Sequence, residues 1–123
     1  HGDGSWLHGV VAINKKSDDD GMKAIEAAFA GHASMKHVWV VDSDIDVTDP
    51  ESVEWAMATR FQGDSGLVVK TGVKGSSLDP SSNPETRETV KVGFDCTIPL
   101  ERDKDDFARP KPGMKVKLED YLD

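Results

Sequence analysis

Residues 36–60 read KHVWVVDSDIDVTDPESVEWAMATR and carry the strongest secondary-structure signals in the chain. Residues 36–41 form a nearly continuous apolar run, which is typical of a central strand covered on both faces. Asp49 is a favourable N-cap, and Pro50 suits the first helical position, where its missing N–H costs nothing. Apolar residues then recur at helical spacing as far as Phe61. These residues therefore predict a strand, an acidic loop and a helix.

The flanking segments extend this pattern in both directions. The further expected elements are strands at residues 7–13, 67–70 and 90–98, a helix at residues 18–31 and a Gly- and Ser-rich loop at residues 72–84. Strands that alternate with helices indicate an α/β fold. We expect a mixed sheet from a βαβαβ core with a later C-terminal strand, and helices packed on the sheet. The charged, proline-punctuated residues 99–123 predict an extended tail.

Length and composition restrict the class of protein. The 123 residues suit a single domain over residues 1–123. Because the chain begins with His1 and not Met, we expect it to be part of a longer protein. Its 15 basic against 23 acidic residues give a net charge of -8, which disfavours nucleic acid and anionic membranes as partners. No apolar run approaches the roughly 20 residues of a membrane span, and no signal-peptide pattern is visible. These features favour a cytoplasmic protein.

The acidic loop is the sharpest local feature. Its four aspartates are Asp42, Asp44, Asp46 and Asp49. The Asp-x-Asp-x-Asp opening resembles a calcium loop, but Val47 and Val53 stand where that loop needs Gly and Glu. Carboxylates at a strand end and a helix start also satisfy backbone N–H groups. We therefore favour a structural loop and keep a divalent-cation site as an alternative.

Other residue types that could carry chemistry lack the required spacing. There is no Gly-rich phosphate loop and no serine triad pattern. His8, His32 and His37 are scattered and form no spaced pair on one expected helix face, so each is interpreted as a surface or structural residue. Cys96 is the only cysteine, which excludes an internal disulfide, and its place in a strand predicts a small buried apolar side chain.

Two further features remain open at this point. Arg60 ends the second expected helix, where a cation is favourable in itself, and it could also bind an anion or hold a partner domain. Leu67 and Val69 fit either the core or the wall of an apolar pocket. Taken alone, the residues predict an α/β domain without a self-contained active site.

The run of residues 36–60 resembles the signature of the C-terminal domain of the UbiD family, the decarboxylases that use prenylated flavin mononucleotide (FMN). Residues 7–13 are similar to the strand that opens this domain. SLDPS at residues 77–81 and KVGFDCT at residues 91–97 are similar to two late elements of the family. Phe94 and Cys96 replace the usual Ile and Ala. The resemblance covers nearly the whole chain in order.

The resemblance implies a carboxy-lyase that acts on an aromatic or α,β-unsaturated carboxylic acid, with the reverse carboxylation possible. Prenylated FMN, a divalent metal and the catalytic residues would all lie upstream of this chain. No position here matches those catalytic residues, so we expect the chain alone to be inactive and to bind no cofactor. The partners would be the N-terminal flavin-binding region, further copies in a homo-oligomer, and a flavin prenyltransferase that supplies the cofactor.

The resemblance also assigns roles within this chain. The domain would cover the flavin pocket and aid oligomerisation, with Leu67 and Val69 lining the substrate pocket. The four aspartates and Arg60 would form a structural signature, with no metal bound. The alternatives are a non-catalytic assembly domain and a divalent-cation binder that uses the aspartate loop.

Overall fold

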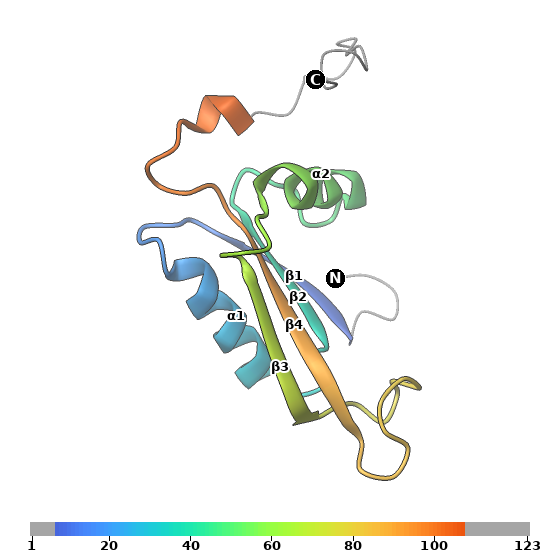
Figure 1. The fold of residues 1–123 in the computed structure, drawn as a ribbon. Helices are drawn as coiled ribbons and strands as arrows, with labels where there is room; N and C mark the ends of the chain where they lie inside the picture. Colours follow the sequence, from blue (N-terminus) through green and yellow to red (C-terminus); the bar gives the residue numbers. More distant parts are fainter. Residues whose placement is uncertain (1–6, 108–123) are drawn as a thin grey trace.

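The computed structural model describes residues 7–107 (Figure 1). Its elements are β1 (His8–Ile13), α1 (Asp20–Gly31), β2 (His37–Asp42), α2 (Pro50–Arg60), β3 (Leu67–Lys74), β4 (Glu88–Cys96) and a short 3-10 helix, η1 (Lys104–Phe107). Every expected helix and strand is present in the expected order. Of the expected tail, residues 108–123 lie outside the described residues.

The four strands form one mixed sheet in the order β1-β2-β4-β3. Strands β1, β2 and β4 run parallel, and β3 pairs antiparallel with β4 at the edge. The α/β class and the mixed sheet are confirmed. The insertion of β4 between β2 and β3 was not part of the prediction, because long-range pairing leaves no local signal in a sequence.

Two strands differ from their expected bounds. β4 is Glu88–Cys96 where residues 90–98 were expected, and β3 is longer than expected. β3 continues to Lys74, whereas the sequence suggested a loop from Gly72 onward. Gly72 has a φ of 63° and lies where the pairing register of β3 shifts between Lys70 and Val73. Glycine supplies the left-handed backbone that such a bulge requires. The glycine therefore marks an irregularity within the strand and not its end.

The two helices pack on opposite faces of the sheet. Figure 1 shows α1 along one face, where Ile25 and Phe29 meet Val38 and Val40. Gly93 of β4 lies beneath Ile25, and the missing side chain lets α1 approach closely. Helix α2 covers the other face, through a cluster of Val41, Ile45, Ala56 and Cys96. Alternating side chains of β2 thus supply both cores.

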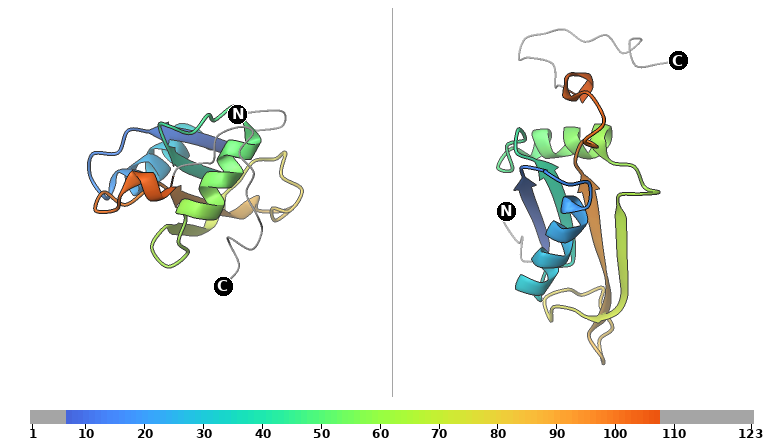
Figure 2. Two further views of the ribbon diagram at one scale, coloured as in Figure 1. Left: turned by 90° about the horizontal axis from the view of Figure 1, so that it is seen from above. Right: turned by 90° about the vertical axis from the view of Figure 1, so that its left-hand side faces the viewer.

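Helix α2 crosses only one end of its face. In Figures 1 and 2 it lies across the carboxyl ends of the parallel strands, while the strands continue well beyond it. The remainder of that face carries no helix among residues 7–107. No helix in the described range is both long enough and apolar enough to cross a bilayer.

The loop between β3 and β4 is anchored at the opposite end of the sheet. Asp79 is buried and its carboxylate lies 3.0 Å from the ammonium of Lys36, which precedes β2. Ser81 donates to the same carboxylate through its backbone N–H, at 2.9 Å, and its hydroxyl, at 2.6 Å. Hydrogen bonds from Ser81 and Lys36 lower the pKa of Asp79 to about 2. The SLDPS segment therefore ties this loop to the sheet.

Candidate functional site

Arg60 is the centre of a charged network at the carboxyl end of the sheet. Its guanidinium donates to Asp42 Oδ2 at 3.1 Å and to both carboxylate oxygens of Asp44 at 2.8 and 3.0 Å. It also donates to the carbonyl of Phe107 in η1 at 3.0 Å. The Arg60 side chain is only 1% exposed. One buried cation thus joins the end of α2 to the β2 loop and to η1.

The surroundings shift the pKa values of the two carboxylates in opposite directions. Burial raises the pKa of Asp42, although the Ile98 N–H and Arg60 oppose it. The hydrogen bonds from Arg60 lower the pKa of Asp44, which is more exposed. Asp42 is therefore the member of the network that depends most on its cation, because a buried charge without a partner is costly.

The other two aspartates of the loop serve local turns. Asp46 accepts from the Thr48 N–H at 2.9 Å. Asp49 accepts from the Glu51 N–H at 3.1 Å, as an N-cap of α2. Within residues 7–107 no group of three or more metal-ligating side chains is placed to hold a metal ion. The carboxylates of the acidic loop are engaged by Arg60, by turns and by a helix cap, so the geometry lends no support to a cation site there.

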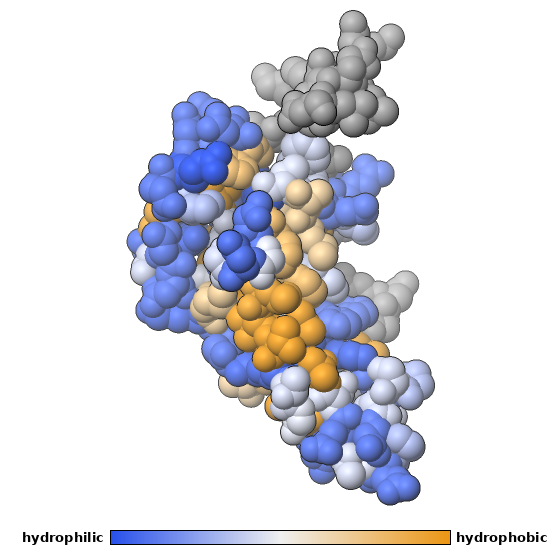
Figure 3. Space-filling model, viewed as in Figure 1, coloured by the Kyte–Doolittle hydropathy of each residue, from blue (hydrophilic) through white to orange (hydrophobic). Residues whose placement is uncertain are grey.

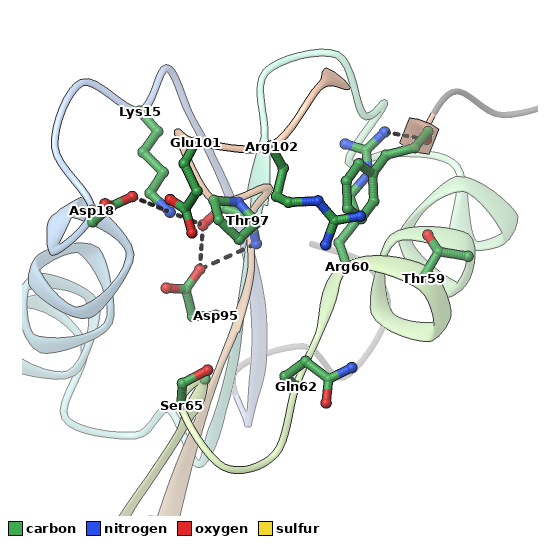
Figure 4. Close-up of a pocket in the computed structure, with 13 residues that line it drawn as sticks. Lys15, Asp18, Thr59, Arg60, Gln62, Ser65, Asp95, Thr97, Glu101 and Arg102 are labelled. Atoms are coloured by element: carbon green, nitrogen blue, oxygen red, sulfur yellow. Dashed lines mark hydrogen bonds and ion pairs between the residues drawn. The ribbon is translucent and has the colours of Figure 1, made fainter. Parts of the chain in front are cut away.

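A crevice of about 310 Å³ opens beside this network (Figure 4). It lies between the start of α1, the end of α2, the end of β4 and the segment before η1. Its charged lining residues are Lys15, Arg60, Arg102, Asp18, Asp95 and Glu101. Lys15 points inward and donates to Thr97 Oγ1 at 3.2 Å, and Asp95 accepts from the Thr97 N–H at 3.1 Å. With balanced charge and no His or Cys in its lining, the crevice defines no nucleophile–base pair.

The second candidate region is the part of the sheet face that α2 leaves uncovered. Leu67 and Val69 of β3 are 42% and 52% exposed, and they pair in register with Phe94 and Val92 of β4. Val68 points to the other face and packs on the α1 core. Figure 3 shows apolar surface gathered over this part of the molecule. A contiguous apolar patch of this kind is typical of a surface that contacts another molecule.

Aromatic rings form the floor of this face beside the two β3 residues. Trp39 stacks on Phe94 with ring centroids 5.4 Å apart and planes at 7°. Phe61 meets Phe94 edge-on at 5.5 Å. The Trp39 indole N–H points to Met57 Sδ at 3.1 Å, which ties it to α2. Each ring of this floor thus packs against a neighbouring ring.

The structure brings together two histidines that the sequence analysis treated separately. His8 and His37 are aligned across β1 and β2, and their Nδ1 atoms lie 2.9 Å apart. Burial, and next the neighbouring His8, lower the pKa of His37. The sequence carried part of the signal, because each histidine opens an apolar strand, but only the register of β1 and β2 aligns them.

Cys96 lies in the α2 core and is fully buried. Burial raises the pKa of its thiol to about 12. The side chain therefore behaves as the small apolar group that the sequence predicted, because a thiol reacts as its thiolate.

Within residues 7–107 these observations define an α/β domain whose charged network links its own elements and whose apolar face is left partly uncovered. Residues 1–96 match the family model of the 3-octaprenyl-4-hydroxybenzoate carboxy-lyase C-terminal domain. The chain belongs to the UbiD family, as its C-terminal domain.

Relatives and solved structures agree with this assignment. The chain is 53% identical over 106 residues to anhydromevalonate phosphate decarboxylase of Methanocaldococcus jannaschii. This match covers 86% of the chain and 25% of that protein. The chain is 33% identical to gallate decarboxylase of Lactiplantibacillus plantarum, over 97% of the chain and 26% of that protein. The UbiD-class enzyme HmfF from Pelotomaculum thermopropionicum, solved with FMN, superposes with a TM-score of 0.78 at 42% identity, over 94% of the chain and 26% of that structure. The chain thus spans about a quarter of the length of these proteins.

Proposed function

We propose that the chain is the C-terminal domain of a decarboxylase that removes CO2 from an aromatic or α,β-unsaturated carboxylic acid, or adds it in reverse, with prenylated FMN. The family match carries the proposal. It is supported by relatives named as decarboxylases and by HmfF, which has been solved with FMN and, in an evolved dimeric form, with prFMN. Five relatives of 49–55% identity are anhydromevalonate phosphate decarboxylases, so that acid is the first substrate to test.

The flavin and its divalent metal belong, in this proposal, to the rest of the parent protein. Neither the acidic loop nor the crevice beside it fits these groups, because the carboxylates of the loop are engaged by Arg60 and by turns, and the crevice has balanced charge. The flavin would supply the electron sink for loss of CO2. The residues of this chain would act on the substrate side only, by contact and by exclusion of water.

The uncovered sheet face is the part of the domain that we assign to the reaction. Leu67 and Val69 would line the apolar wall of the substrate pocket, on the aromatic floor of Trp39 and Phe94. An apolar wall expels water, which strengthens electrostatic interactions at the reacting carboxylate and protects reactive intermediates. The domain would therefore complete a pocket whose catalytic groups lie in the N-terminal flavin-binding region.

Absorbance spectra test the division of labour. The parent protein and this chain are purified from cells that co-express a flavin prenyltransferase, and both are scanned in the near-UV and visible range. We expect a flavin band and decarboxylation of anhydromevalonate phosphate or a related unsaturated acid in the parent only. A flavin band and turnover from the chain alone would contradict the proposal, as would a parent without flavin.

Substitutions in the parent test the assigned wall. Leu67→Ala and Val69→Ala remove apolar contact area worth about 1–2 kcal/mol, so we expect kcat/KM to fall roughly five- to thirtyfold. Lys70→Ala is the matched control, because Lys70 lies on the same strand but pairs with Glu26 of α1 on the other face, at 2.8 Å. Unchanged kinetics in both wall variants, with flavin retained, would remove these residues from the pocket.

An assembly role is the second candidate, and the difference between the two edges of the described sheet favours it. The edge strand β1 carries no charged residue, whereas β3 is interrupted by a register shift and carries Lys70 and Lys74. An uncharged, regular edge is a template for strand pairing. Light scattering on the chain alone distinguishes the roles: a stable oligomer supports assembly, and a monomer at high concentration counts against it.

A further inference from the structure

The two histidines at the amino ends of β1 and β2 form a pair that the proposed function does not use. His8 and His37 occupy matched positions on adjacent parallel strands, so their side chains leave the same face of the sheet. Their ring planes lie within 12° of each other, with centroids 4.8 Å apart. His8 is exposed and His37 is half-buried, so the pair is reachable from solvent.

The spacing of the two nitrogens suits a shared ligand. Two imidazole nitrogens at about 2.0–2.1 Å from one ion lie about 2.9 Å apart at the right angle of square-planar or octahedral sites, and about 3.3 Å apart at the tetrahedral angle of Zn²⁺. The Nδ1 atoms of His8 and His37 are separated by 2.9 Å. In the absence of metal this contact needs one Nδ1 proton, donated from one ring to the other. When a metal ion binds both Nδ1 atoms, the ring that carried the Nδ1 proton changes tautomer and carries its proton on Nε2. Both rings stay neutral, so binding releases no proton.

The surroundings hold the pair in place and keep the nearest cation away. Trp39 backs both rings, with centroids 5.6 Å from His8 and 5.9 Å from His37. Lys36 precedes His37 in the chain, but its ammonium is held by Asp79 at 3.0 Å and by Ser81 Oγ at 2.6 Å. The positive charge closest in sequence is thus engaged elsewhere.

We propose that His8 and His37 bind one divalent transition-metal ion of right-angle geometry, such as Ni²⁺ or Cu²⁺, through their Nδ1 atoms. Imidazole nitrogen is a preferred ligand for these ions. Among residues 7–107 no third ligating side chain joins the pair, so water fills the remaining positions. The proposal concerns this chain alone and does not depend on the decarboxylase assignment.

The test uses the 123-residue chain in a His1→Ser background. The free amine and imidazole of an N-terminal histidine can themselves chelate these ions, and this substitution removes them. Calorimetric titration with NiCl2 should show one saturable ion per chain. Titration with NiCl2 should quench Trp fluorescence, because Trp39 lies beside the site, and Trp39→Phe should reduce the quenching.

Single substitutions locate the site. His8→Gln and His37→Gln should each weaken Ni²⁺ binding roughly tenfold or more, because each removes one of the two protein ligands. His32→Gln is the matched control: His32 caps α1, which packs on the opposite face of the sheet from the pair, and the substitution should leave the affinity unchanged. Circular dichroism confirms that each variant is folded. The proposal would be overturned if the His1→Ser chain showed no saturable binding, or if His8→Gln in that chain left the affinity unchanged.

Discussion

Arg60→Met removes the only cation that contacts Asp42 and Asp44 within residues 7–107. The substitution keeps the apolar stem of the side chain but deletes the donors to both carboxylates and to the Phe107 carbonyl. Asp42 would retain the Ile98 N–H at 3.0 Å as a donor. It would lose the charge that offsets its burial. The variant therefore tests whether the network stabilises the fold.

The expected loss follows from the burial of each partner. Removing one member of a buried ion pair costs about 3–5 kcal/mol, because the other charge is left uncompensated. The Asp42 side chain is 13% exposed, but that of Asp44 is 61% exposed and is screened by water. We therefore expect the lower end, about 3 kcal/mol, out of a total unfolding free energy of roughly 5–15 kcal/mol. The melting temperature should fall by roughly 10 °C.

Urea and thermal denaturation, followed by circular dichroism at neutral pH, measure the change. Lys23→Met is the control, because Lys23 forms a solvent-exposed pair with Asp19 at 3.3 Å, so its loss should change the stability much less than Arg60→Met does. Adding Asp42→Asn to Arg60→Met should recover part of the loss, since the unpaired charge is then absent. A loss below about 1 kcal/mol in Arg60→Met, or no recovery in the double variant, would refute the reasoning.

Two further predictions concern the packing of α1 and the β3–β4 loop. Gly93→Ala would place a Cβ against the buried Ile25, so we expect the unfolding free energy in urea denaturation to fall by about 1–3 kcal/mol. Gly31→Ala is the control, because a Cβ there meets no other atom and should leave the unfolding free energy unchanged. Equal effects of the two substitutions would show that α1 can shift to make room. Asp79, with its pKa lowered to about 2, should hold Lys36 fully above about pH 4 and release it as pH falls towards 2. Its contribution to stability is thus lost on acidification, and Asp79→Asn should flatten the pH dependence of the melting temperature in that range.

Local chemistry explains how much of the fold the sequence predicts. The Asp49–Pro50 pair sets the start of α2, and the apolar run before Asp42 sets β2, because caps and periodicity act over a few residues. The end of β3 was misplaced, because Gly72 signals both a loop and a bulge and only the pairing with β4 distinguishes them.

The candidate sites depend on contacts between distant residues. The acidic loop and Arg60 were both visible in the sequence, but their ion pairs required α2 to fold back over the end of β2. His8 and His37 were also visible, and only the parallel register placed their Nδ1 atoms 2.9 Å apart.

The sequence by itself determined the element order, the α/β class and the resemblance to the UbiD C-terminal domain, because these reside in local patterns and in motifs read along the chain. Only the tertiary structure decided the strand order and the partners of Arg60. It also decided that Leu67 and Val69 face outward, away from the core of α1. The physical reason is that each of these depends on which face of a strand meets which helix. That choice depends on pairing register across the whole sheet, since a shift of one residue turns every side chain to the opposite face.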